Sequence, residues 1–287
     1  MPSYELNGKV ALVTGGARGI GFATCRALVS RGASVAVVDL DRDAAERAAA
    51  QLDDTRAIGL AADVTDRGAL QRAVATTVER FGGLDVVVAN AGVASRVASF
   101  RAMSPETFER VLDVNLHGVH RTVEAALPEI VRRRGHVVVI SSIYAFFNGV
   151  GAAPYAMSKA AVEQFGRALR VELAPSGASA SVAYFGFIDT EMVHRAIDAD
   201  PLSERLLATL PKPLHKRLQP AAAGEAIARG IERRAPRIIR PRRWAVWSVL
   251  RGIVNPLTDA RAERDATTLE LVREFDARAG EDQPTTA

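Results

Sequence analysis

The stretch KVALVTGGARGIGFA (residues 9–23) joins a short apolar run to four glycines within seven positions, Gly15, Gly16, Gly19 and Gly21. The run is rich in β-branched residues, as expected of a strand that is buried on both faces. Glycine lets the chain turn tightly into a helix and lets backbone N–H groups approach a pyrophosphate, which the positive end of the helix attracts. A strand–helix turn also uses glycine without any ligand, but the position after the first strand favours nucleotide binding.

The same design repeats along the chain. Four further apolar runs are typical of buried strands: SVAVVD (34–39), LDVVVAN (84–90), GHVVVIS (135–141) and ASASVAY (178–184). Segments with the length and pattern of helices accompany them, at 19–31, 41–52, 66–81, 104–133 and 155–174. This alternation predicts an α/β fold, a Rossmann-type doubly wound parallel sheet of about seven strands with helices on both faces.

The pattern loosens after residue 190. We expect one domain over residues 1–241, which includes a substrate lid at about 190–220 that is either flexible or a pair of short helices. PRIIRP (236–241) is expected to be a last short strand. Residues 242–280 are predicted to form an extra helical C-terminal extension, and the polar tail 281–287 is expected to be disordered.

Composition narrows the classes of protein. Nearly half of the 287 residues are apolar, which indicates a globular chain. The single cysteine, Cys25, excludes an internal disulfide and a zinc cluster, and the five histidines are scattered, so no metal site is expected. The N-terminus MPSYELNGK lacks an apolar signal core and no apolar run reaches membrane-spanning length, which predicts a cytoplasmic protein.

Positive charge is concentrated near the C-terminal end. Residues 212–251 contain eleven Lys and Arg but only two acids, Glu225 and Glu232, within a chain whose net charge is +4. Such a segment can meet an acidic substrate or an anionic membrane, or can be a solvated basic face. No nucleic-acid reading module accompanies it, so nucleic acid is not expected as a partner.

The second strand ends in Asp39. A carboxylate at this place accepts hydrogen bonds from the hydroxyls of an adenosine ribose and repels a 2′-phosphate. Asp41 adds to that repulsion, whereas Arg18 and Arg42 can pair with a phosphate. Because Leu40 stands where a phosphate-binding cation would be most useful, NAD is favoured over NADP.

Tyr155 and Lys159 form a pair four residues apart on a predicted helix. The chain has 37 Lys and Arg but only four Lys, so this lysine stands out. Residues i and i+4 share a helix face, so the ammonium can lie beside the phenol and lower its pKa towards neutrality. Ser142 follows a buried strand at the sheet edge where ligands bind. We expect Ser142 and Tyr155 to contact a substrate oxygen, with Tyr155 moving the proton.

In these motifs the sequence resembles the short-chain dehydrogenase/reductase family, over roughly residues 7–195. TGGARGIG (14–21) matches the family's TGxxxGxG, and Ser142 with YAMSK (155–159) matches its catalytic Ser and YxxxK. The resemblance implies four catalytic residues, Asn115, Ser142, Tyr155 and Lys159. It implies cofactor contacts from Gly15, Arg18, Gly19, Ile20, Gly21, Asp39, Asp63, Val64, Asn90, Ala91, Gly92, Tyr155, Lys159, Ile188 and Thr190.

Two features depart from the family pattern. Ala89 precedes the NAG motif where an Asn is usual, and Phe185 with Gly186 replaces the usual Pro-Gly after the sixth strand. The implied reaction is reversible hydride transfer between nicotinamide and an alcohol or carbonyl carbon. The alternatives are a sensor or scaffold that binds NAD without turnover, and an enzyme for a polar substrate such as a sugar. The intact proton-relay residues favour the enzyme.

The expected substrate wall consists of residues 93–97, 143–150, 185–187 and the lid after Glu191. Its large side chains are mostly apolar: Ile143, Tyr144, Phe146, Phe147, Val150, Met157, Phe185 and Phe187. This composition favours a steroid-, terpenoid- or fatty-chain-like secondary alcohol or ketone.

RRWAVWSVLRGIV (242–254) carries two Trp beside Arg, which suits a membrane interface or a subunit interface. We expect packing on a lid or a partner subunit, in a homo-oligomer such as a dimer or tetramer, with peripheral membrane contact as the alternative.

Overall fold

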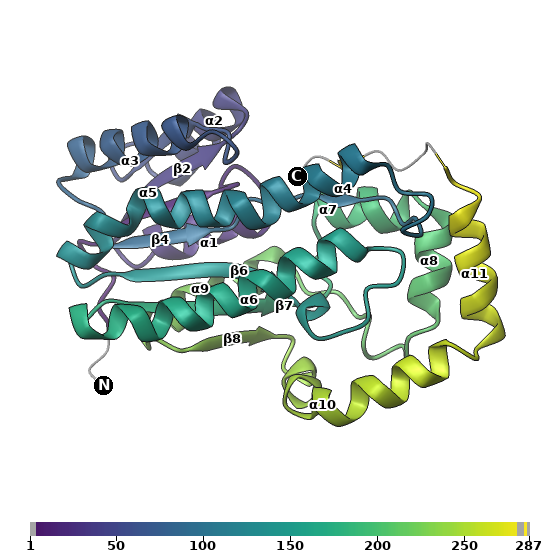
Figure 1. Ribbon diagram of the computed structural model, residues 1–287. Helices are drawn as coiled ribbons and strands as arrows, with labels where there is room; N and C mark the ends of the chain where they lie inside the picture. Colours follow the sequence, from purple (N-terminus) through teal and green to yellow (C-terminus); the bar gives the residue numbers. More distant parts are fainter. Residues whose placement is uncertain (1–3, 280–283, 286–287) are drawn as a thin grey trace.

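A computed structural model describes residues 4–279 and 284–285, and its centre is a seven-stranded parallel sheet (Figure 1). The strand order is β3-β2-β1-β4-β6-β7-β8, which reverses direction between β1 and β4, as in a doubly wound fold. The predicted fold class is confirmed. The strands are β1 (Val10–Thr14), β2 (Ser34–Asp39), β3 (Ala57–Ala61), β4 (Val86–Ala89), β6 (His136–Ser142), β7 (Ser179–Phe185) and β8 (Arg237–Arg240).

Two layers of helices bury the sheet. One apolar core joins the sheet to α1 (Gly19–Val29), α2 (Arg42–Leu52) and α9 (Pro220–Glu232). The other joins it to α3 (Arg67–Phe81), α5 (Gly118–Arg132) and α6 (Ala153–Leu173). In Figure 1 the helices α5 and α6 run side by side across the front of the sheet. The predicted apolar runs form the inner strands, which explains why they do not alternate polar and apolar residues.

The strand β3 has no strong sequence signal of its own. Its sequence AIGLA lies at the edge of the sheet and is mostly half-buried. An edge strand needs fewer large apolar side chains than an inner one, so only the motif that follows it at Asp63 indicated its place.

The helix predicted over 104–133 is interrupted. It begins as expected, because the Ser104 hydroxyl accepts a hydrogen bond from the Thr107 N–H at 3.2 Å and Pro105 occupies the first turn. The structure then divides the segment into α4 (Pro105–Leu112), a π-helical turn η1 (Asp113–His117) and α5. The wider turn places Asn115 at the break, a position that the helical periodicity did not reveal.

The lid and the extension form one wall beside the sheet. The lid contains α7 (Glu191–Val193), the π-helical turn η4 (His194–Asp198) and α8 (Pro201–Ala208), and the extension contains α10 (Arg243–Ala262) and α11 (Ala266–Asp276). Figure 1 shows α8 and α11 side by side, and Arg205 of α8 pairs with Glu274 of α11 at 2.6 Å. Arg278 pairs with the buried Asp200 at 2.5 Å, which fastens the end of the extension to the lid.

The tail was expected to be disordered over 281–287. Pro284–Thr285 instead form a short strand, β9, antiparallel to β5 (Ala94–Ser95). Residues 281–283 and 286–287 lie outside the described part of the chain. Among the described residues, no helix has the length and hydropathy that would let it cross a membrane.

Candidate active site

The carboxyl ends of β1, β4, β6 and β7 meet at one edge of the sheet, and the predicted site residues follow them there. At the end of β1 the glycines leave space that a side chain would fill. Gly15 has φ +61°, and a Cβ on Gly21 would lie 1.9 Å from the Gly15 carbonyl oxygen. Asn90 holds this turn from β4, because its amide donates to the carbonyls of Thr14 and Gly15 at 3.0 Å each.

The start of α1 suits an anion. Among the described residues, no side chain caps the N-terminus of α1. The backbone N–H groups of Gly19, Ile20 and Gly21 at the start of the helix therefore have no capping partner. Uncapped N–H groups at a helix N-terminus favour a pyrophosphate. The turn therefore fits the phosphates of a dinucleotide.

Asp39 closes the other side of the turn. Its carboxylate is buried and accepts hydrogen bonds from the N–H groups of Ala17 at 3.1 Å and Leu40 at 2.9 Å. Each carboxylate oxygen keeps a further lone pair for a ribose hydroxyl. The Leu40 side chain is 62 % exposed at the same corner. In the next strand connection Asp63 accepts from the Thr65 N–H at 2.8 Å, and Val64 is buried.

Arg18 has a protein partner. Its guanidinium pairs with Glu191 at 3.1 Å, and both side chains are nearly half exposed. This ion pair joins the glycine turn to the first residue of the lid. Thr190 also lies against the glycine turn, because a Cβ on Gly19 would lie 3.3 Å from the Thr190 Cγ2. Sequence reasoning assigned Arg18 to phosphate and did not foresee its pairing with the lid.

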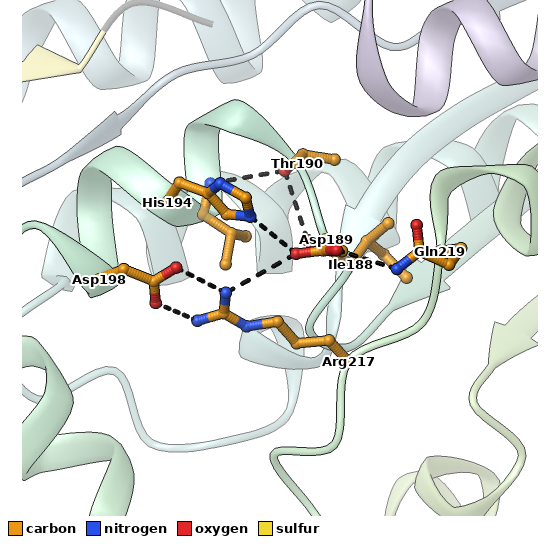
Figure 2. Close-up of polar contacts among 8 residues, drawn as sticks. Ile188, Asp189, Thr190, His194, Asp198, Arg217 and Gln219 are labelled. Atoms are coloured by element: carbon orange, nitrogen blue, oxygen red, sulfur yellow. Dashed lines mark hydrogen bonds and ion pairs between the residues drawn. The ribbon is translucent and has the colours of Figure 1, made fainter.

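The segment that carries Ile188 and Thr190 is anchored by a polar cluster that the sequence did not reveal (Figure 2). Asp189 Oδ1 lies 2.7 Å from His194 Nε2, and Asp189 Oδ2 accepts from Gln219 Nε2 at 2.9 Å. These hydrogen bonds, first that of His194, lower the pKa of Asp189. Arg217 pairs with Asp198 and lies 3.8 Å from Asp189. The partners come from 30 residues of chain around the lid, so no local motif contains them.

Asn115 and Lys159 converge behind the strand ends. In the π-helical turn the Asn115 side chain accepts from the Val93 N–H at 2.8 Å and donates to the Val93 carbonyl at 2.9 Å. A Cβ on Gly92 would lie 3.0 Å from Asn115 Oδ1 and 3.6 Å from Lys159 Nζ. The glycine of the NAG motif therefore leaves room for the two side chains, and a Cβ there would press on the Asn115 amide oxygen.

Ser142, Tyr155 and Lys159 are brought together, as predicted. The Lys159 ammonium donates to the Ile140 carbonyl at 3.1 Å and lies 5.5 Å from the centre of the Tyr155 ring. The Ser142 hydroxyl donates to the Phe185 carbonyl at 3.3 Å and lies beside the Tyr155 phenol in the same cavity wall. Burial lowers the pKa of Lys159 to about 8.

The pKa of Tyr155 differs from the expectation. Burial raises the pKa of its phenol above the usual value of 10.0, and the hydrogen bond from Ser142 opposes that rise only in part. The sequence argument considered the attraction of the ammonium and left out the loss of water around the phenol. In this structure Tyr155 is a neutral phenol, which is the protonation state of a proton donor.

A cavity of about 970 Å³ opens from Ser142 and Tyr155 towards the extension. Five of the eight predicted wall residues line it: Ile143, Tyr144, Phe147, Val150 and Phe187. The other three do not, and the prediction was wrong for them. Phe146 packs against Tyr184 in the core, Phe185 is buried in β7, and Met157 is 52 % exposed on α6.

The remaining wall comes from the lid and from α10. The lid contributes Met192, Val193, Ile197, Leu206, Leu207 and Leu210, and α10 contributes Trp247 and Val254. Trp244 is fully buried, and its ring centre lies 5.9 Å from that of Phe147 and 5.8 Å from that of Trp247. Both tryptophans thus pack against other parts of the chain, in line with the expected packing on the lid side.

Comparisons with known proteins agree with this geometry. Residues 9–200 match the family described as short chain dehydrogenase. The rat (Rattus norvegicus) protein L-fucose dehydrogenase is 35 % identical over 222 residues, which is 77 % of this chain and 82 % of the relative. Cyclopentanol dehydrogenase of a Comamonas strain is 32 % identical over 226 residues, 78 % of this chain and 89 % of the relative.

A solved structure extends the likeness to a bound cofactor. The 3-ketoacyl-(acyl-carrier-protein) reductase from Brucella melitensis, complexed with NADH, superposes with a TM-score of 0.70 at 26 % identity and covers 82 % of this chain and 97 % of that one. With the family match spanning well over half of the sequence, the chain belongs to the short-chain dehydrogenases, and it is an oxidoreductase of the NAD(P)-binding Rossmann type.

Proposed function

We propose that this oxidoreductase uses NAD to interconvert a bulky hydrophobic secondary alcohol and its ketone, of steroid-, terpenoid- or fatty-chain-like character. The observation that carries the proposal is the cavity of about 970 Å³ that begins at Ser142 and Tyr155 and is walled mainly by apolar side chains. Its volume is at the upper end of the range for drug-sized ligands, and apolar walls favour apolar substrates.

The residues present fit a nicotinamide dinucleotide. The glycine turn and the start of α1 would hold its phosphates, Asp39 its adenosine ribose, and Lys159 its second ribose. Ile188 and Thr190 would contact the nicotinamide end. When bound, the nicotinamide donates or accepts the hydride, which is chemistry that no side chain of the protein supplies.

The protein's own residues orient the substrate and move the proton. Ser142 stands beside the Tyr155 phenol in the cavity wall, so the two hydroxyls can bind one substrate oxygen together. In the reductive direction Tyr155 gives its proton to that oxygen, and in the oxidative direction it takes the proton back. The Lys159 ammonium, 5.5 Å from the Tyr155 ring centre, stabilises the phenolate formed meanwhile.

Asn115 supports this arrangement. Its side chain holds the Val93 backbone on both sides and lies next to Lys159 across Gly92. We infer that it positions the lysine and a water that leads the proton away. A sensor that only binds NAD would need none of these four residues, so their convergence supports turnover.

A polar substrate is the second candidate. The 35 % identity to an L-fucose dehydrogenase favours a sugar. Against it, most of the cavity wall is apolar, and side chains such as Ile143, Phe147 and Phe187 offer a sugar's hydroxyl groups no hydrogen-bond partner. The likeness to a cyclopentanol dehydrogenase shows that an apolar alcohol substrate also occurs among relatives.

The experiment is a screen by the absorbance of NADH. Secondary alcohols of increasing size, from cyclopentanol to sterols, and L-fucose are each tested with NAD and with NADP. We expect kcat/KM to rise with apolar size and to be higher with NAD. Turnover of L-fucose but not of the large alcohols would contradict the proposal. We further propose a cytoplasmic homo-oligomer, a dimer or tetramer, which size-exclusion chromatography with light scattering tests.

A further inference from the structure

The helix α10 has two different apolar faces. Its inner face contains Trp244 and Ser248, which are buried, and Trp247 and Val254, which line the substrate cavity. Its outer face carries large apolar side chains that are mostly exposed. We call these residues the outer stripe: Val246 (63 % exposed), Val249 (72 %), Leu250 (44 %), Ile253 (67 %) and Leu257 (68 %).

The spacing makes the outer stripe continuous. Each member has another three or four residues away, and Val249 and Leu250 are adjacent, so all five lie on one side of the helix over a length of about 17 Å. Scattered exposed apolar residues are ordinary, but a continuous stripe marks a surface that meets another apolar phase. The packing of the two tryptophans covers only the inner face of α10, so the outer stripe remains exposed to solvent.

Positive charge surrounds the N-terminal end of the stripe. Arg242 is exposed there, and Arg243 donates to the carbonyls of Leu214 and Lys216, which brings the exposed Lys212 and Lys216 next to the helix. The sequence from 242 to 257 contains no acidic residue. Burial lowers the pKa of Arg240, and the charges of Arg242, Arg229 and Arg233 lower it further, which reports the concentration of positive charge at this end.

An apolar stripe with cations at one end fits one class of occupant. A helix that lies in a membrane interface buries its apolar side among the acyl chains and directs Lys and Arg to anionic headgroups. A second copy of this chain would bring another stripe but also another group of cations, and it would offer no acidic residue from 242–257 to neutralise them.

We propose that the outer stripe of α10, with Arg242, Lys212 and Lys216 beside it, docks this protein on the surface of an anionic lipid bilayer. The helix lies along the interface and does not cross it. The docking proposal depends only on the outer face of α10, so it can be tested independently of the substrate class proposed above.

The test is flotation of the full-length protein with vesicles of phosphatidylcholine, with and without phosphatidylglycerol. We expect binding to the anionic vesicles, about ten-fold weaker binding without phosphatidylglycerol, and release by high salt, because surface cations act through screened attraction. Val249→Asp combined with Ile253→Asp should weaken vesicle binding about ten-fold or more, because it removes apolar surface and adds negative charge.

The matched control is Phe100→Asp. Phe100 is 74 % exposed, as Val249 nearly is, but it packs on Phe108 of α4, which lies on the opposite side of the molecule from α10 (Figure 1). This variant should bind vesicles like the wild type. NADH affinity, which should not change in either variant, reports that the protein is folded. Absent binding to anionic vesicles overturns the proposal. A wild-type oligomer that the Val249/Ile253 variant dissociates, without vesicle binding by either, would assign the stripe to a second copy instead.

Discussion

The Lys159 ammonium lies 5.5 Å from the centre of the Tyr155 ring and is tethered to the Ile140 carbonyl of β6 at 3.1 Å. The tether fixes a cation at the side of the phenol, where it acts on the charge that Tyr155 gains when it releases its proton. Tyr155 is half-buried and its phenol is largely removed from water, so the Lys159 ammonium and the Ser142 hydroxyl stabilise that charge. This relationship makes separable predictions for the two residues.

Tyr155→Phe should lower kcat by about a hundred-fold or more while NADH affinity stays within about two-fold, because only the transferable proton is lost. Tyr144→Phe is the matched control. Tyr144 is half-buried like Tyr155, lines the cavity and stacks edge-on against Tyr155 with ring centres 5.7 Å apart, but no proton transfer is assigned to it. Steady-state rates and NADH fluorescence titrations measure both variants. A Tyr155→Phe enzyme that keeps more than about a tenth of the rate would refute the assignment.

NADH affinity should fall as the pH rises through about 8. Burial lowers the pKa of Lys159 to about 8 in the folded protein, so the ammonium that would donate to the ribose is present below that pH and is lost above it. We expect the dissociation constant to rise about ten-fold between pH 7 and 10, measured by fluorescence titration. Lys159→Met should bind NADH weakly with little dependence on pH. An unchanged pH profile in Lys159→Met would show that another group titrates.

The wild-type enzyme should prefer NAD, and Asp39→Ala with Leu40→Arg should shift the ratio of kcat/KM values towards NADP about ten-fold or more. The double change removes a buried carboxylate that repels a 2′-phosphate and adds a cation at an exposed corner. Leu40→Arg alone is the control, since Asp39 remains and still repels the phosphate. A preference for NADP in the wild type would contradict the role given to Asp39.

Trp247→Ala should lower kcat/KM for bulky apolar alcohols about ten- to a hundred-fold and leave small alcohols within about three-fold, because it removes an aromatic wall far from the reacting carbon. Val246→Ala, on the outer face of the same helix, should change neither. Kinetics with a series of alcohols of graded size measure the effect. An equal loss for small and large alcohols would mean that Trp247 supports the fold and does not select the substrate.

Acid should destabilise the protein through His136. Burial, together with the charges of Arg234 and Arg170, lowers the pKa of this imidazole to about 3, and its nitrogens lie 2.6 and 2.7 Å from the Ser179 and Ser181 hydroxyls. The unfolded chain binds the proton below about pH 6.5, whereas the folded chain resists it down to about 3. Stability is therefore complete above pH 6.5 and lost as the pH falls.

Between pH 7 and 4 this histidine should account for about 3 kcal/mol of the loss in unfolding free energy. Urea unfolding at both pH values measures it. His136→Asn keeps polar contacts with the serines but does not titrate, so its stability should fall less steeply over the same range. Equal slopes in the two proteins would place the acid sensitivity elsewhere.

Much of this enzyme could be predicted from its sequence because the decisive signals are local. The inner strands follow from runs of β-branched residues, and the Tyr155–Lys159 pair follows from the geometry of one helix turn. The polar cluster at Asp189 could not be predicted in this way, because its partners are set by how the lid folds back. The direction of the tryptophans was also hidden, since α10 is apolar on both faces and periodicity cannot tell which face is inward.

The order of elements along the chain has a consequence for how this enzyme can change. The sheet is complete at β8, and only then does the chain build α10 and α11, which close the far side of the cavity. Tyr155, its neighbours and the lid therefore lie in an earlier stretch of the chain, and the far side of the substrate wall lies in a later one. A single recombination event after β8 can replace the far side of the cavity and leave the catalytic residues unchanged. The range of alcohol substrates can then change without any change in the reaction.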